Sequence, residues 1–346
     1  MRAHRMSRHR TGLLVGGIAI SAFLLWLALR NVQADEFRKA LVQADYRDLL
    51  PFTACLLAFY WVRTYRWRLL LGHISSVNTR DLFGPVMIGY GANFLLPFQF
   101  GEVARSFAAR SRTKLPFMPI AFSVIVERLF DFVVILMALS LALAMHRQLP
   151  DYVASLGLMA ALVVAVLIVA SVLFALHTEP AIALVGRCLA VLPDALRDLI
   201  LRQLRSGAKG LHSLLDRTIV LKVALVSIVQ WTILLVCIWI TLHAVGVTAS
   251  VPTLLLILAL VVLGSSIPNA PGYLGSIQAG YVLALEATNG DGSQGLAASV
   301  VFHMIYALTA LGLGAYALRR ASIDLRTVGE SGNGDDAVNA VNEKGS

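Results

Sequence analysis

Six stretches of this sequence are apolar over a length that can cross a lipid bilayer, and this feature limits the possible fold more than any other. A helix that crosses a membrane needs roughly 20 predominantly apolar residues. The stretches are 11–29, 49–71, 117–145, 152–176, 219–244 and 296–318. The whole chain is 58% hydrophobic and only 14% charged, a composition that excludes a water-soluble globular domain. The sequence predicts an all-α integral membrane protein with about six full spans.

The charged residues and the motifs argue against several other classes of protein. The formal net charge is +9, but apolar runs separate the arginine clusters, so no continuous basic surface for nucleic acid is expected. Cys55, Cys188 and Cys237 lie far apart and lack the paired spacing of metal ligands or of a disulfide framework. The sequence contains no GxxxxGK[ST], HExxH or GxSxG motif. We therefore expect a protein without cofactor or metal that is not an enzyme.

The distribution of Lys and Arg predicts the orientation, because short loops rich in these residues stay in the cytoplasm. The basic N-terminal residues 1–10 and the segment 101–115 are expected inside. The loops 245–251 and 287–295 contain no Lys or Arg and are expected outside, and two arginines after the last apolar stretch place the C-terminus inside. The prediction is a multi-pass protein of the cell (inner) membrane with both termini in the cytoplasm.

The membrane domain is expected to cover residues 11–320. Within it, the segment 177–218 carries six basic residues and has leucine and isoleucine at helical spacing. This pattern predicts a cytoplasmic amphipathic helix on the membrane surface. Residues 321–346 are polar and show no apolar periodicity, which predicts a disordered cytoplasmic tail.

The predicted orientation requires the apolar stretches 82–98 and 252–286 to begin and end on the same side of the membrane. Both contain helix-breaking residues, in GYGANFLLPFQFGE at 89–102 and in GSSIPNAPGYLG at 264–275. Broken backbone is tolerated at membrane depth only where it is buried in protein or lines a wet cavity. Two such segments with opposed orientation predict two re-entrant broken-helix hairpins in an inverted-repeat arrangement, with a transport site near the membrane midplane. The alternative is that the prolines merely kink two ordinary helices.

Three ionisable residues, Glu127, Arg128 and Asp131, lie within the apolar stretch 117–145. Such residues are costly in a membrane and usually mark a functional site with a charged partner. Arg128 can pair with Asp131 three positions later on the helix. The remaining negative charge requires another cation, and Arg105, which shares a helix face with Glu102, is the candidate. The alternative is a structural ion-pair cluster that holds the first hairpin in place.

Other polar residues in the apolar helices are weaker signals. His303 and Gln230 occur singly and are interpreted as packing residues. Arg63, Arg66 and Arg68 lie near the cytoplasmic end of their span and are expected to extend to headgroup phosphates, although a path for anionic headgroups would use the same arginines.

Three motifs resemble those of the flippase-like family, which corresponds to the transmembrane region of lysylphosphatidylglycerol synthases. They are NFLLPFQFGEVAR at 93–105, VERLFD at 126–131 and IPNAPGYLGSIQ at 267–278, and the resemblance extends over about 11–320. It implies translocation of a lipid with a polar headgroup between leaflets. The candidate residues for substrate binding and translocation are Asn93, Pro97, Gln99, Gly101, Glu102, Arg105, Glu127, Arg128, Asp131, Pro268, Pro271, Gly272, Gly275 and Gln278.

Two positions depart from the commonest family pattern. Many members have Arg where this chain has Gln99, and many have Glu where it has Gln278. The loss of one positive and one negative group keeps the overall charge balance but puts the headgroup preference in question. The segment after Arg320 is too short for a cytoplasmic aminoacyl-transfer domain, so lipid aminoacylation is not expected.

The sequence therefore predicts translocation of a polar-headgroup lipid or a lipid-linked precursor. One alternative is an integral-membrane transferase that uses Glu127 or Asp131 as general base on a lipid carrier. Another is a non-transporting scaffold of the cell envelope. The expected partners are membrane lipids with an anionic or lipid-linked headgroup and, beyond these, a second copy of the chain or a protein of envelope biosynthesis.

Overall fold

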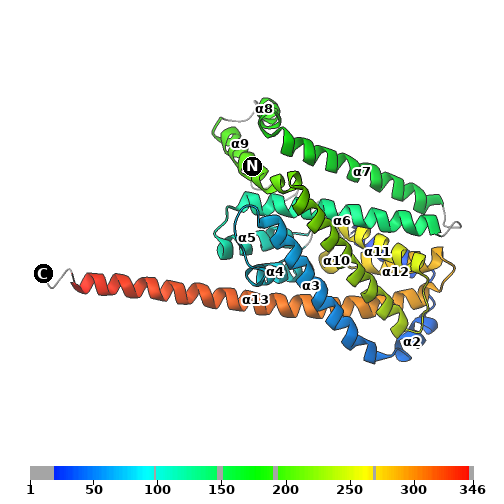
Figure 1. Ribbon diagram of the computed structural model, residues 1–346. Helices are drawn as coiled ribbons and strands as arrows, with labels where there is room; N and C mark the ends of the chain where they lie inside the picture. The colour runs from blue at the N-terminus through cyan, green and yellow to red at the C-terminus, as the bar shows by residue number, and fades with distance from the viewer. Residues whose placement is uncertain (1–18, 97–98, 146–150, 190–193, 268–269, 343–346) are drawn as a thin grey trace, which may run out of the picture.

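The computed structural model describes residues 19–96, 99–145, 151–189, 194–267 and 270–342, and all regular structure in these ranges is helical (Figure 1). The prediction of an all-α protein is confirmed for this part of the chain. The longer helices, in chain order, are Ala19–Leu29, α2 (Ala34–Val42), α3 (Leu49–Leu71), α4 (Thr79–Leu95), α5 (Gly101–Thr113), α6 (Phe117–Met145), α7 (Asp151–Leu176), α8 (Thr178–Cys188), α9 (Asp194–Leu211), α10 (Arg217–Ala244), α11 (Val251–Ser266), α12 (Ser276–Ala287) and α13 (Gly292–Asn342). Short 3-10 turns are η1 (Tyr46–Asp48), η3 (His212–Leu215) and η4 (Pro271–Tyr273).

The predicted apolar stretches correspond closely to helices. Five of them coincide with α3, α6, α7, α10 and the first part of α13, and the sixth, 11–29, is described from Ala19 onward. The basic residues 1–10 lie outside the described residues. Among the described helices, α10 and the part Gly292–Ala321 of α13 are long and apolar enough to cross a membrane by length and hydropathy. The total number of spans stays a prediction.

Helices α4 and α5 form a first helical hairpin. The Asn93 Oδ1 atom accepts a hydrogen bond of 2.8 Å from the Gly101 N–H, and a Cβ at Gly89 would lie 2.8 Å from the Arg105 Cβ. These contacts show that the two helices are antiparallel and closely packed. The sequence predicted a hairpin within 82–98, and this is wrong in detail, because α4 is one continuous helix through Leu95 and the second helix of the hairpin, α5, begins only at Gly101. The apolar pattern did not indicate α5 as the second helix of the hairpin, because this helix is polar: Arg105 is buried against protein, whereas Arg110 and Arg112 are exposed.

Helices α11 and α12 form a second helical hairpin, at the stretch 252–286 where one was predicted. A Cβ at Gly280 would lie 2.8 Å from the Val261 backbone nitrogen, and the Thr253 and Thr288 hydroxyls lie 3.2 Å apart near the open end. The tip contains η4, in which Gly272 has a φ of 75°. Whether either hairpin enters and leaves the membrane on one side stays a prediction.

The two hairpins are packed into the bundle by long helices from the opposite part of the chain. Helix α13 packs on α4, α6 packs on α11, and α3 packs on α10. Apolar helices gain little from burial against each other in lipid, so their association depends on close packing and small residues. The α4–α13 contact has this character, because a Cβ at Gly91 would lie 3.3 Å from the Gly314 Cα.

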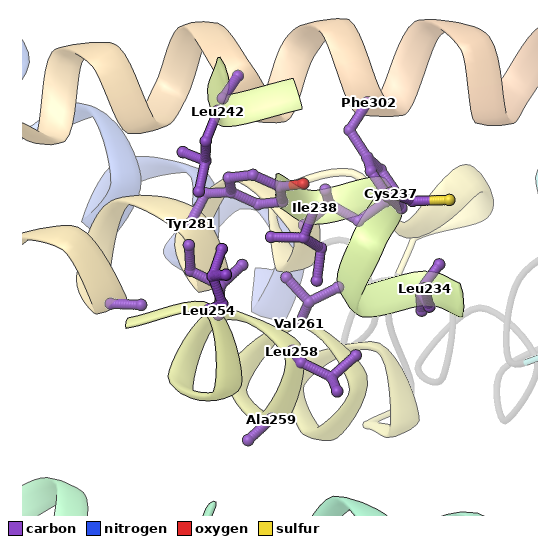
Figure 2. Close-up of a cluster of buried hydrophobic side chains, with 14 of the residues drawn as sticks. Leu234, Cys237, Ile238, Leu242, Leu254, Leu258, Ala259, Val261, Tyr281 and Phe302 are labelled. Atoms are coloured by element: carbon purple, nitrogen blue, oxygen red, sulfur yellow. The ribbon is translucent and has the colours of Figure 1, made fainter. Parts of the chain in front are cut away.

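The largest apolar core lies where α10 meets the second hairpin and α13 (Figure 2). Leu234, Ile238 and Leu242 of α10 lie beside Leu254 and Leu258 of α11 in this view. The Thr241 and Tyr281 hydroxyls lie 2.9 Å apart within the core, which pairs two buried polar groups. This core fixes the second hairpin against the long helix α10.

The segment 177–218 forms two helices, α8 and α9, instead of one. Helix α9 packs on α6, and its Leu211 is buried there in a cluster with Val126 and Val223. Part of its apolar face is therefore covered by the bundle. The placement of this segment on the cytoplasmic membrane surface stays a prediction.

Helix α13 continues through Asn342, so residues 321–342 are helical in the structure, whereas their composition predicted disorder. In Figure 1 this end of α13 projects away from the other helices. No proline interrupts the chain in this range, so the helix can continue through local backbone hydrogen bonds.

Candidate functional site

Glu127 on α6 is the centre of a buried ion-pair cluster between α3, α5 and α6. Its carboxylate lies 2.7 Å from an Nη atom of Arg63, 3.0 Å from one of Arg66 and 2.9 Å from one of Arg105. The Glu127 side chain is completely buried. A buried charge requires such partners, because desolvation would otherwise neutralise or exclude it.

Asp131 lies one turn further along α6 and extends the cluster toward α10. Its carboxylate is 2.6 Å from an Nη atom of Arg66 and 3.5 Å from one of Arg63, and it accepts a hydrogen bond of 3.0 Å from the Trp231 indole N–H. Arg66 also donates to the Ser227 hydroxyl at 2.9 Å. Helices α3, α6 and α10 are therefore joined by charged and polar groups in an otherwise apolar region.

Arg128 pairs with Glu102 at the first turn of α5, and the predicted pair of Arg128 with Asp131 is wrong. Residues 128 and 131 lie three apart on one helix. However, α5, the second helix of the first hairpin, brings Glu102 to Arg128, and α3 supplies Arg63 and Arg66 to Asp131. Side-chain exposure is 27% for Arg128 and 18% for Glu102, against 4% or less for the other members. The cluster therefore has a dry end and an open end.

Arg63 and Arg66 also belong to the cluster, which the sequence did not predict. They were expected to extend to headgroup phosphates, but the structure buries them at 3% and 0% exposure, because Glu127 and Asp131 offset the cost of burial. Their spacing was a usable signal: two arginines three apart on α3 match two carboxylates four apart on α6. In total, four arginines and three carboxylates give the cluster a formal charge of +1.

Several buried nitrogen atoms of the cluster have no hydrogen-bond acceptor among the described residues. They include the Nε atoms of Arg63, Arg66 and Arg105. The Arg105 Nε lies 2.6 Å from a Glu102 oxygen, but the two groups do not meet hydrogen-bond geometry. Arg63 and Arg105 instead lie over the Tyr90 and Trp67 rings, at 5.5 and 4.7 Å from the ring centroids. The guanidinium groups keep donor capacity that no carboxylate uses.

A cavity of about 90 Å³ adjoins the open end of the cluster. Its charged lining consists of Arg63, Glu102, Arg105 and Arg128. The lining also includes Tyr90, Tyr273 and Tyr306, aromatic residues for which the sequence provides no functional signal. This volume corresponds to about three water molecules in the liquid. The cluster thus adjoins a small vestibule whose lining is mainly apolar apart from these charged groups, and a whole lipid headgroup would need the cavity to open.

The tips of the two hairpins meet at this cavity. The Gln99 side-chain amide donates to the Ser265 carbonyl at 2.5 Å, and the Phe94 and Tyr273 rings pack edge to face with centroids 6.0 Å apart. Gln99 and Tyr273 both have left-handed backbone, with φ of 55° and 60°. Such conformations are strained for residues other than glycine and are often found at functional sites. Each tip contributes one of these residues to the cavity wall.

The other predicted site residues shape the tips and lie outside the charged cluster. The Asn93–Gly101 hydrogen bond joins the two helices of the first hairpin. Gly275 is the N-cap residue of α12, with a φ of 89° and an N–H that donates to Gln278 Oε1 at 2.9 Å. The Gln278 amide also lies 2.9 Å from the His303 ring nitrogen. The remaining two described members, which belong to η4, are Pro271 and Gly272. Pro97 and Pro268 lie outside the described residues.

The match to a known family agrees with this architecture. No curated protein and no solved structure matches the chain. Residues 14–314, which include every helix of the two hairpins and the whole charged cluster, match the family described as lysylphosphatidylglycerol synthase TM region. The chain is a helical membrane protein and belongs to the lysylphosphatidylglycerol synthase TM region family.

Proposed function

We propose that this protein moves a phosphate-bearing lipid between the leaflets of the cell membrane. The observation that carries the proposal is the buried cluster with a charge of +1 that opens into a cavity between two hairpin tips. One phosphodiester carries one negative charge and would neutralise the cluster. Guanidinium groups bind phosphate oxygens through paired hydrogen bonds, and Arg63, Arg105 and Arg128 line the cavity.

The packing of the helices supports an exchange between two conformations. Each half of the chain has a long helix, a helical hairpin and a second long helix: α3 to α6 in the first half and α10 to α13 in the second. The second long helix of each half packs on the hairpin of the other half. In our proposal the halves are an inverted repeat, both termini are cytoplasmic, and rocking of one half against the other opens the cavity to either leaflet.

The geometry favours translocation over a transferase reaction. Glu127 and Asp131, the carboxylates that a transferase would use as general base, are each held by at least two arginines at the buried end of the cluster. This arrangement suits a fixed electrostatic role. We also propose that the chain has no aminoacyl-transfer activity of its own and that its partners are membrane lipids.

The test is translocation in liposomes by the purified protein. Liposomes would contain phosphatidylglycerol or phosphatidylethanolamine labelled on the headgroup, and a membrane-impermeant quencher would report the accessible leaflet. We expect the wild-type protein to move the lipid, and Arg105→Ala to abolish movement at equal amounts of folded protein. Arg205→Ala is the matched control, because Arg205 pairs with Glu179 on the exposed face of α8 and α9. A folded wild-type protein that moves no phosphate-bearing lipid would exclude the proposed function.

A further inference from the structure

Glu102, at the open end of the cluster, differs from the other two carboxylates in its exposure and its contacts. All three carboxylates accept hydrogen bonds from arginines, but Glu127 and Asp131 are buried, whereas Glu102 is part-exposed and lines the cavity. Glu102 contacts two arginines, Arg105 on its own helix and Arg128 on α6. Both of these arginines also line the cavity.

Glu102 is an imperfect partner for Arg105. The two residues lie three apart on α5, and their charged atoms approach to 2.6 Å without hydrogen-bond geometry. The Arg105 Nε–H therefore has no acceptor among the described residues, although Arg105 is only 2% exposed. A buried donor without an acceptor is costly, so an oxygen that reached it from the cavity would be favoured. The Arg63 Nε, also buried beside the cavity, is in the same condition.

We propose that Glu102 is an internal substitute for the lipid phosphate: it holds Arg105 and Arg128 while the site is empty, and an incoming phosphodiester displaces it. This inference rests on the proposed function and adds the residue that competes with substrate. The phosphate brings the same kind of charge-assisted acceptor as the carboxylate, and it is free of the helix geometry that misaligns Glu102. Displacement would release Glu102 and α5 from Arg128, which links headgroup binding to movement of the first hairpin.

The test measures binding of dihexanoyl phosphatidylglycerol, a short-chain phosphodiester lipid, to the full-length protein in detergent. Tryptophan fluorescence provides a reporter, because the Trp67 ring lies 4.7 Å from the Arg105 guanidinium carbon, and Trp67→Phe identifies the contribution of this residue among the five tryptophans. We expect Glu102→Gln to lower the Kd by about fivefold to tenfold, since the competing charge is removed. Tenfold corresponds to about 1.4 kcal/mol. Glu179→Gln, which removes a carboxylate paired with Arg205 at the surface, should leave the Kd unchanged.

Two further arms make the result decisive. If Glu102→Gln fails to fold, Glu102→Asp provides the test instead. This variant keeps the charge but shortens the side chain, which weakens its contact with the arginines, so it should bind the lipid more tightly than the wild type does. Dimethyl phosphate is a phosphodiester monoanion without acyl chains, so its binding distinguishes a site for a free phosphate from a site for a lipid. A gain in affinity for dimethyl phosphate without a gain for the lipid would overturn exchange with a lipid headgroup.

The failure of this inference is distinguishable from failure of the proposed function. If the wild type binds and translocates the lipid but Glu102→Gln binds it equally or more weakly, Glu102 is a ligand of the headgroup or a bystander, and the exchange is refuted. If wild type and variant neither bind nor translocate the lipid, both proposals are refuted.

Discussion

Replacement of Glu127 by Gln tests whether one carboxylate holds the core of this protein together. Glu127 is fully buried, and three arginines, Arg63, Arg66 and Arg105, lie within 3.0 Å of it. The variant keeps the size of the side chain but leaves these cations without their common anion. Removal of one partner from a buried ion pair typically costs about 3 to 5 kcal/mol. At roughly 2 °C per kcal/mol for a large domain, we expect the Tm to fall by at least about 6 °C.

The assay is thermal unfolding in detergent, followed by the reaction of a fluorogenic maleimide with cysteines that unfolding exposes, among them the buried Cys237. Glu179→Gln is the matched control, since it removes a carboxylate from an exposed ion pair and should leave the Tm nearly unchanged. The double variant Glu127→Gln with Arg63→Gln should recover part of the loss, because it removes the arginine whose shortest contact is with Glu127 and leaves the Arg66–Asp131 pair intact. A Tm for Glu127→Gln within about 1 °C of the control would refute the electrostatic account of the cluster.

Three further predictions concern packing, the hydrogen bond to α10, and topology. Gly280→Ala should destabilise the second hairpin, because the added Cβ would lie 2.8 Å from the Val261 nitrogen. Gly312→Ala is the control, since an added Cβ there would have no neighbour within 4 Å. Equal Tm values for the two variants would contradict the packing of α11 on α12. Trp231→Phe removes the indole donor to Asp131 and should cost about 1.5 to 3 kcal/mol in the same unfolding assay, and a neutral result would mean that this hydrogen bond contributes no net stability. Cysteines at Thr113 and Asn289 should react with an impermeant maleimide from opposite sides of the membrane, and labelling of both from one side would exclude the opposed hairpins.

Local sequence features predicted much of the fold. Apolar length predicted α3, α6, α7 and α10 almost to the residue, because a helix in lipid must be long and apolar whatever its neighbours are. The helix-breaking residues around Gly272 marked the tip of the second hairpin for a similar local reason. The placement of the polar helix α5 depends on contacts with other helices, which the apolar pattern does not record. The sequence therefore predicted the turn of the first hairpin at the wrong position.

The charged cluster, too, was predicted in part from the sequence and in part is defined only by the tertiary structure. The sequence by itself determined that Glu127, Arg128 and Asp131 require partners, because an unpaired charge in an apolar helix is too costly to occur without a reason. Only the tertiary structure decided which charges meet. It brings Arg63 and Arg66 of α3 to Glu127 and Asp131 of α6 and leaves Arg128 to Glu102. Ion pairing acts over a few ångströms in space, and the distance between these residues along the chain carries no record of it.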